Sequence, residues 1–183
     1  KKTAMLSVAG EIAPSSPESP FEITIAATVL NGEKYDLIIQ KSVELGVTRL
    51  IPLNTIRCDV KPRDAAKRLD RWRRIAMEAT KQSGRAKLMK IAEPSGFEDL
   101  LTELKGENVV LFSERDGSDF QTIKAGKNIT ALYGPKGGWD DSELEAAAKH
   151  GINIVTLSGR ILRAETASIA ITAILQHRFG DLN

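Results

Sequence analysis

The spacing of apolar residues predicts that strands and helices alternate along most of this chain. Short apolar runs, which are typical of buried strands, occur at 21–27, 49–53, 88–92, 108–112, 129–133 and 152–157. Helical patterns lie between them, at 33–45, 64–83, 97–105, 141–149 and 163–178. Strands that alternate with helices favour a mainly parallel sheet covered by helices on both faces. We therefore expect an α/β fold.

The predicted helix 64–83 separates an apolar stripe from a basic face. The stripe consists of Ala65, Leu69, Trp72, Ala76 and Ala79, and the basic face of Lys67, Arg71, Arg74, Lys81 and Arg85, interrupted by Glu78. Residues 61–90 hold 11 basic and 3 acidic side chains and carry a net charge of +8, which leaves −6 for the rest of a chain whose net charge is +2. A solvated helix face would also be basic, but this asymmetry favours a polyanion partner.

Composition narrows the possible classes of protein. Hydrophobic residues make up 42% and charged residues 27% of the 183 positions, which indicates a folded globule. No apolar run approaches the roughly 20 residues of a membrane span. The single cysteine, Cys58, cannot form an internal disulfide and favours a reducing, cytoplasmic setting. One cysteine and two histidines argue against a zinc site, so we expect no metal.

Two loops follow predicted strands, where open α/β sheets bind ligands. The first is Gly134–Gly138, and the second, within 157–167, carries Arg163 and Glu165. Neither matches the common phosphate-binding fingerprints. Glycines let a ligand approach the backbone, although a plain strand-to-helix turn could also require them. Arginine at a helix start opposes the helix dipole, which favours a functional role over a simple Arg163–Glu165 surface pair.

Four motifs in separate parts of the chain give further support for a functional role of these loops. They are Gln40–Val47, Arg71–Arg85, Gly134–Gly138 and Leu157–Ala167. In this order they resemble the small-subunit ribosomal RNA (uracil-N3) methyltransferases, a branch of the SPOUT, or trefoil-knot, superfamily. The resemblance covers about residues 21–183. Three positions depart from the family pattern, with Lys136 in place of Glu, Ser158 in place of Gly and Met89 in place of Pro.

The resemblance implies the fold, the domains and the partners. Residues 21–183 would form a SPOUT methyltransferase domain with a C-terminal deep trefoil knot. Residues 1–20 would be the remnant of an N-terminal PUA-like RNA-binding barrel with its connector. The chain would form a homodimer and act on small-subunit ribosomal RNA or the assembled small subunit, away from membranes.

The resemblance also implies site residues and a cofactor, S-adenosylmethionine. The expected cofactor-binding residues are Phe112, Tyr133, Gly134, Gly138, Leu157, Ser158, Gly159, Ile161, Leu162 and Thr166. Arg163 would stabilise charge on the uracil, and Glu165 would act as a base or orient Arg163. The expected RNA-binding residues are Arg57, Arg74, Lys81 and Arg85.

Two alternatives remain open at this stage. A SPOUT enzyme could methylate another RNA position, such as a ribose 2′-OH, and the methylated product would distinguish it. A non-catalytic RNA-binding module would keep the basic helix but would not bind the cofactor.

Overall fold

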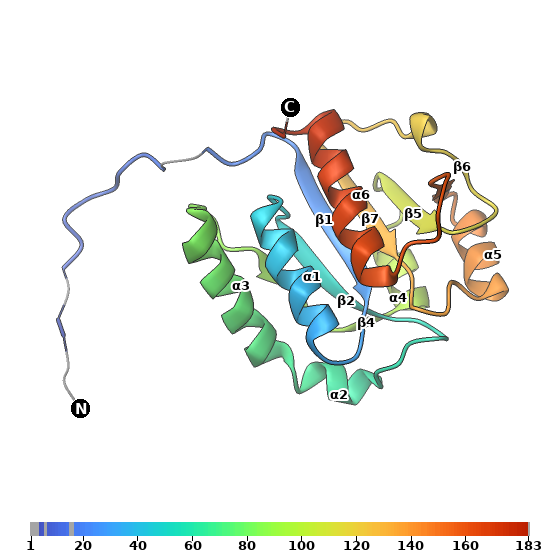
Figure 1. The fold of residues 1–183 in the computed structure, drawn as a ribbon, viewed down its shortest axis with the longest axis horizontal. Helices are drawn as coiled ribbons and strands as arrows, with labels where there is room; N and C mark the ends of the chain where they lie inside the picture. The colour runs from blue at the N-terminus through green and yellow to red at the C-terminus, as the bar shows by residue number, and fades with distance from the viewer. Residues whose placement is uncertain (1–3, 6, 15–16, 183) are drawn as a thin grey trace.

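The computed structural model describes residues 4–5, 7–14 and 17–182, and one parallel sheet organises them. Its strands are β1 (Glu22–Thr28), β2 (Arg49–Asn54), β3 (Lys90–Ile91), β4 (Ser95–Gly96), β5 (Val109–Ser113), β6 (Ser118–Asp119), β7 (Asn128–Tyr133) and β8 (Asn153–Thr156). The strand order is β3-β2-β1-β7-β5-β8-β6, β4 also pairs with β2, and every pair is parallel (Figure 1). The predicted α/β sheet is confirmed.

Helices cover both faces of this sheet. They are α1 (Glu33–Glu44), α2 (Pro62–Ala66), α3 (Leu69–Ser83), α4 (Phe97–Glu103), α5 (Asp141–Lys149) and α6 (Ala164–Phe179), with a 3-10 turn at Phe120–Thr122. Helices α1, α3 and α6 pack side by side on one face, and α4 and α5 lie on the other (Figure 1). Alternate side chains of β1 enter the two cores, Ile23 and Ile25 on the first face and Ala26 on the second. Burial on both faces explains why the strands read as continuous apolar runs.

The prediction of one helix over 64–83 is wrong, because the chain turns at Lys67 and Arg68 between α2 and α3. The N–H of Arg68 donates to the Ala65 carbonyl at 2.9 Å and closes this turn. The turn keeps the apolar stripe in register, so Ala65 on α2 and Leu69 on α3 are both buried. The four-residue spacing between Ala65 and Leu69 therefore does not require a continuous helix. The predicted stop at Gly84 is confirmed, since this glycine caps α3 with a φ of 68°.

The sequence predicts an apolar stripe on the last helix, and this prediction is only partly right; its residues are Ala167, Ala170, Ile171, Ile174 and Leu175. Ile171 and Leu175 are buried, but Ile174 is 39% exposed. The buried face of α6 also contains three polar residues, Ser168, Thr172 and Gln176. Each has a hydrogen-bond partner: Ser168 donates to the Ala164 carbonyl, Thr172 to the Ser168 carbonyl and Gln176 to the Leu45 carbonyl. Satisfied polar groups can lie in a core, which hydrophobic spacing alone does not predict.

The return from β8 to α6 carries the chain back across the sheet. Helix α6 lies against α1 and β7, whereas β8 lies on the far side of β5. This path is consistent with the C-terminal knot that the resemblance implies. No helix among the described residues has the length and apolar character needed to cross a membrane.

The segment before β1 contains no strand in its described part. The predicted connector at 1–20 falls partly on residues 1–3, 6, 15 and 16, which lie outside the described residues. Its end is attached to the domain, because Glu18 pairs with Arg85 at 2.6 Å. The edges of the sheet also differ from the prediction: the predicted strand 88–92 shortens to β3, and β6 was not predicted, because two-residue strands have no readable periodicity.

Candidate functional site

Three loops meet at the carboxyl edge of three neighbouring strands, β7, β5 and β8. In the register, Phe112 of β5 pairs with Tyr133 of β7 and with Val155 of β8, so the three strands end at one level. The loops that follow are 134–140, 113–117 and 157–163. Ligands of open α/β sheets bind outside such strand ends. The structure thus brings the two loops predicted from sequence to the same edge.

The loop Gly134–Gly138 wraps around a buried tryptophan. Trp139 is 1% exposed, and its indole N–H donates to the Phe112 carbonyl at 2.8 Å. A Cβ added at Gly134 would lie 2.8 Å from the Trp139 Nε1, so only glycine fits there. Gly138 has a φ of 72°, which L side chains rarely adopt. Glycine is therefore required at 134 by packing against Trp139 and at 138 by the backbone conformation.

Phe112 and Tyr133 place their side chains in the core rather than at this edge. Both rings are buried, and their centroids lie 5.6 Å apart. The Tyr133 hydroxyl bonds with Thr172 at 2.9 Å, and its carbonyl accepts from the Thr28 hydroxyl at 3.1 Å. Burial raises the pKa of Tyr133, so the phenol stays neutral. Only the backbone of these two predicted cofactor residues can contact a ligand at the edge.

The second loop is largely exposed. Ile161 is 85% and Leu162 39% exposed, and Ser158 and Gly159 lie on the surface with them, while Leu157 packs partly against the core. Arg163 is the exposed N-cap residue of α6, and Thr166 is exposed in the first turn of that helix. No hydrogen bond or ion pair joins the Arg163 side chain to another residue within the described part of the chain. Its guanidinium is thus free to contact a ligand.

Glu165 pairs with Lys34, a residue that sequence analysis missed. Lys34 Nζ lies 3.3 Å from Glu165 Oε1, and this contact joins the start of α1 to the start of α6. Burial raises the pKa of Glu165, but its own backbone N–H and the charges of Lys34 and Arg163 outweigh burial and lower it overall. An ionised carboxylate of low pKa is a weak base. This environment suits positioning better than proton abstraction.

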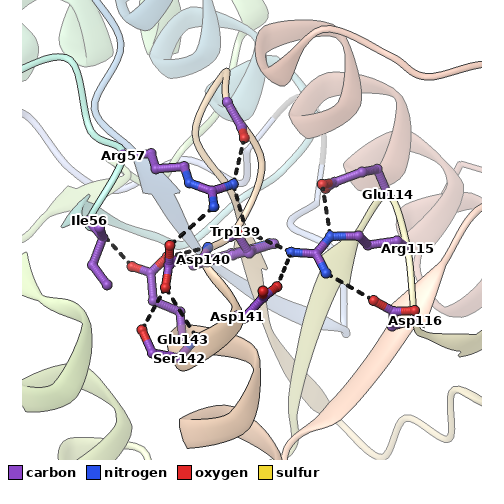
Figure 2. Close-up of polar contacts among 11 residues, drawn as sticks. Ile56, Arg57, Glu114, Arg115, Asp116, Trp139, Asp140, Asp141, Ser142 and Glu143 are labelled. Carbon is purple, nitrogen blue, oxygen red and sulfur yellow. Dashed lines mark hydrogen bonds and ion pairs between the residues drawn. The ribbon is translucent and has the colours of Figure 1, made fainter.

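Arg57, predicted to bind RNA, contacts the glycine loop instead of lying on the basic helix. It donates to the carbonyls of Gly137 and Trp139, each at 3.1 Å, and to Asp140 Oδ2 at 3.1 Å (Figure 2). Hydrogen bonds from Ser142, together with the charge of Arg57, lower the pKa of Asp140. The loop after β2 is thereby attached to the loop after β7.

Two further residues connect these loops and were not predicted as site residues. Arg115 donates to the Trp139 carbonyl at 3.1 Å and to Asp141 Oδ1 at 2.6 Å (Figure 2). Glu143 is buried and accepts from the backbone N–H of Ile56 at 2.9 Å and of Asp140 at 3.0 Å. Asp140 and Glu143 have the sequence spacing of an N-cap residue and its N3 partner, which predicts a capping box, and the structure confirms it at the start of α5. The position of Arg115 just after a strand was the available signal for it.

The remaining predicted RNA-binding residues differ in accessibility. Arg74 and Lys81 are exposed on α3, and Arg74 lines a groove of about 480 Å³ between α1 and α3 together with Arg71. Arg85 is only 9% exposed. It donates to the carbonyls of Val43 and Val47 at 2.9 Å and pairs with Glu18. Arg85 is thus held inside the structure and does not join the exposed face.

No group of three or more His, Cys, Asp or Glu side chains within 4–5, 7–14 and 17–182 could hold a metal ion. The geometry of the site is thus made of backbone, arginines and isolated carboxylates. Such a site can hold a polar organic ligand and stabilise negative charge.

Comparison with known proteins is consistent with this arrangement. A family model described as "RNA methyltransferase domain" matches residues 17–176. The chain is 35% identical to Ribosomal RNA small subunit methyltransferase E of Mesomycoplasma hyopneumoniae over 81% of its own length and 66% of that protein. It is 34% identical to the protein of the same name from Synechocystis over 86% of its own length and 54% of that protein. The chain therefore spans about half to two thirds of these relatives.

A solved structure gives the same result. The Ribosomal RNA small subunit methyltransferase E of Neisseria gonorrhoeae, bound to S-adenosyl methionine, is 36% identical to this chain. The TM-score is 0.87, with 93% of this chain and 72% of that one covered.

Proposed function

Because the chain belongs to the RNA methyltransferase domain family, we propose that it transfers the methyl group of S-adenosylmethionine to N3 of a uridine in small-subunit ribosomal RNA. The main support is the meeting of the Gly134–Gly138 loop and the 157–163 loop at one edge of the sheet. The relative from Neisseria gonorrhoeae holds S-adenosyl methionine on a similar fold. A ribosomal substrate also agrees with a cytoplasmic location.

The residues present fit such a cofactor. Gly137 is exposed and has no side chain, so a ligand can approach its backbone, while glycine at 134 and 138 lets the loop pack against Trp139 and Glu114. The cofactor supplies an electrophilic methyl group, so the protein mainly has to position the two reactants. The exposed backbone of the two loops would hold the cofactor, and Ile161 and Leu162 offer apolar contact.

Arg163 carries the remaining chemistry in this proposal. N3 of uracil bears a proton, and loss of this proton to solvent leaves negative charge that is shared with the two carbonyl oxygens of the base. A guanidinium stabilises such charge through two planar donors. Arg163 lies at the end of the cofactor loop, is exposed, and has Glu165 two residues further along. Glu165, held by Lys34, fixes the start of α6 and thus the place from which Arg163 extends.

The product decides between this reaction and its alternatives. Nucleoside mass spectrometry of ribosomal RNA should detect 3-methyluridine in cells that contain the protein and its loss from one small-subunit site in cells that lack it. Loss of a ribose-methylated nucleoside would support the 2′-OH alternative instead. An unchanged nucleoside profile, with RNA binding retained, would favour the non-catalytic module.

We also propose that the exposed face of α3 binds the RNA backbone. The groove between α1 and α3 is bordered by Arg71 and Arg74, and Lys81 lies further along the same helix. Lys81 pairs with Glu78, and both side chains are exposed, whereas Arg71 pairs with Asp36, whose side chain is only 16% exposed. An exposed ion pair contributes little to stability, so a phosphate can replace Glu78 as the partner of Lys81.

Replacing Arg74 and Lys81 together with Ala should weaken RNA binding and lower its salt dependence. Loss of two phosphate contacts should reduce the slope of log K against log salt by about 1.5. The control is the double variant Lys105→Ala and Lys149→Ala, which removes two exposed lysines next to α4 and α5 on the other face. Filter binding over a salt series measures both. Equal salt slopes in the two double variants would show that the exposed face of α3 is an ordinary solvated surface and does not bind RNA.

The proposed homodimer rests on apolar surface at the end of the molecule that carries the site. Ile161, Leu162 and Ile174 are all at least 39% exposed, and they belong to α6 or to the loop before it. A helix with apolar residues on more than its core-facing side is suited to a second contact. Sedimentation velocity tests this directly, and a monomer at all concentrations would remove the dimer from the proposal.

A further inference from the structure

Two arginines from different loops meet at one carbonyl of the glycine loop. We propose that Arg57 and Arg115 are positioning residues that fix the 137–139 backbone in the conformation that binds the cofactor. Neither is expected to touch the reacting atoms. This inference rests on the proposed cofactor, and it gives Arg57 a role different from RNA binding.

Both guanidinium groups donate to the Trp139 carbonyl oxygen. Arg57 Nη1 and Arg115 Nη2 each lie 3.1 Å from it, and they approach from opposite sides (Figure 2). A carbonyl oxygen has two acceptor sites, so both are occupied. The same Nη1 of Arg57 also holds the Gly137 carbonyl at 3.1 Å. Rotation of the Gly137–Gly138 peptide or of the Trp139–Asp140 peptide would therefore break hydrogen bonds to charged donors.

Acidic residues hold each arginine in place. Arg57 pairs with Asp140 at 3.1 Å, and Arg115 pairs with Asp141 at 2.6 Å and Asp116 at 3.0 Å. Without these carboxylates, two like charges on one oxygen would repel each other. Each arginine also comes from another strand end, Arg57 after β2 and Arg115 after β5. The glycine loop after β7 is thus fixed from both sides.

Global stability alone does not account for this arrangement. The Arg57 and Arg115 side chains are 41% and 39% exposed, and ion pairs at that exposure contribute little to folding. Their effect is local, on a loop rich in glycine whose backbone would otherwise have wide freedom. Fixing a binding loop before the ligand arrives reduces the entropy lost on binding. The expected benefit is therefore in cofactor affinity.

Isothermal titration calorimetry with S-adenosylmethionine and S-adenosylhomocysteine tests this role. Arg57→Ala and Arg115→Ala should each raise the cofactor Kd about tenfold, the usual scale for a lost hydrogen bond to a charged group. Arg57→Lys should restore only part of the affinity, because one ammonium cannot reach all three acceptors in the same geometry. The matched control is Arg49→Ala. Arg49 is 38% exposed, pairs with Glu103 at 2.9 Å and lies at the start of β2, the opposite end of the sheet from Arg57.

A readout without cofactor separates positioning from a loss of folding. The protein has two tryptophans, so 5-fluorotryptophan labelling gives two ¹⁹F resonances, and Trp72→Phe assigns them. The Trp139 resonance should shift or broaden in both Ala variants well below their melting temperatures, and stay unchanged in Arg49→Ala. A fold-wide defect would instead change the Trp72 signal as well, and that outcome would overturn the local role.

The possible results keep the two proposals apart. If the unaltered protein binds neither ligand, the proposed function fails. If it binds and both Ala variants bind equally well, the positioning role fails. Unchanged cofactor affinity with reduced RNA affinity in Arg57→Ala would return Arg57 to the RNA-binding residues and would also overturn the inference.

Discussion

Replacing Arg163 with Ala should lower the rate of methyl transfer by about 100-fold, the usual scale for loss of one electrostatic stabiliser. Arg163 is exposed at the start of α6, directly after the loop expected to hold the cofactor. Its removal leaves no cavity in the core, so the melting temperature and the cofactor affinity should change much less. Arg163→Lys should recover part of the rate, since it keeps the charge but not the planar pair of donors.

Single-turnover methylation of small ribosomal subunits is the suitable assay, because it separates the chemical step from product release. Arg178→Ala is the matched control, since Arg178 is also exposed but lies in the last turn of α6, at the other end of the helix from the loop. A normal rate in the Arg163→Ala enzyme would remove this residue from the mechanism. A loss of rate accompanied by an equal loss of folded protein would make its role structural.

Most of the fold could be predicted from the sequence, because the buried residues of most helices and strands recur at a regular spacing. Strands β1, β5 and β7 are covered on both faces, and their apolar runs leave little ambiguity. Helix α5 was predicted with its bounds unchanged because a capping box marks its start and Gly151 its end. The break between α2 and α3 was missed because a short turn preserved the spacing of the stripe. Edge strands β4 and β6 are too short for any period.

The site could be predicted only as far as loops and residue types. Both loops were found because glycines and arginines follow predicted strands there, and the family resemblance then indicated which of their residues would form the site. The partners of those residues come from distant segments, as with Lys34 and Glu165, or Arg115 and Asp141. Sequence spacing contains no information on such contacts. The same limit applies to the basic segment. The sequence predicted one basic surface there, whereas the structure exposes some of its arginines and buries others.

Arg85 illustrates this limit, and its replacement is expected to act on folding instead of RNA binding. Its guanidinium donates hydrogen bonds to the carbonyls of Val43 and Val47 and to the carboxylate of Glu18. Arg85→Ala would remove these bonds from a site in which the Arg85 side chain is 9% exposed, and would leave Glu18 with only the Lys87 N–H and the Val43 carbonyl with only the Gly46 N–H. Breaking a largely buried pair costs about 3 kcal/mol of the free energy of unfolding. For a domain of this size, the melting temperature should fall by roughly 6–12 °C.

Urea unfolding of Arg85→Ala, with Arg74→Ala as the exposed control from the same basic segment, measures this difference. Arg74→Ala should change the free energy of unfolding by less than about 0.5 kcal/mol.

Burial raises the pKa of Glu18, but the hydrogen bonds and charge of Arg85 lower it overall. The pair therefore stabilises the fold fully above the ordinary carboxyl pKa of 4.5, and this contribution is lost as pH falls through the lower folded-state value. The cost of Arg85→Ala should accordingly shrink in acid. A cost that is small at neutral pH, or that stays constant as Glu18 is protonated, would show that the Glu18–Arg85 pair does not hold the N-terminal segment to the domain.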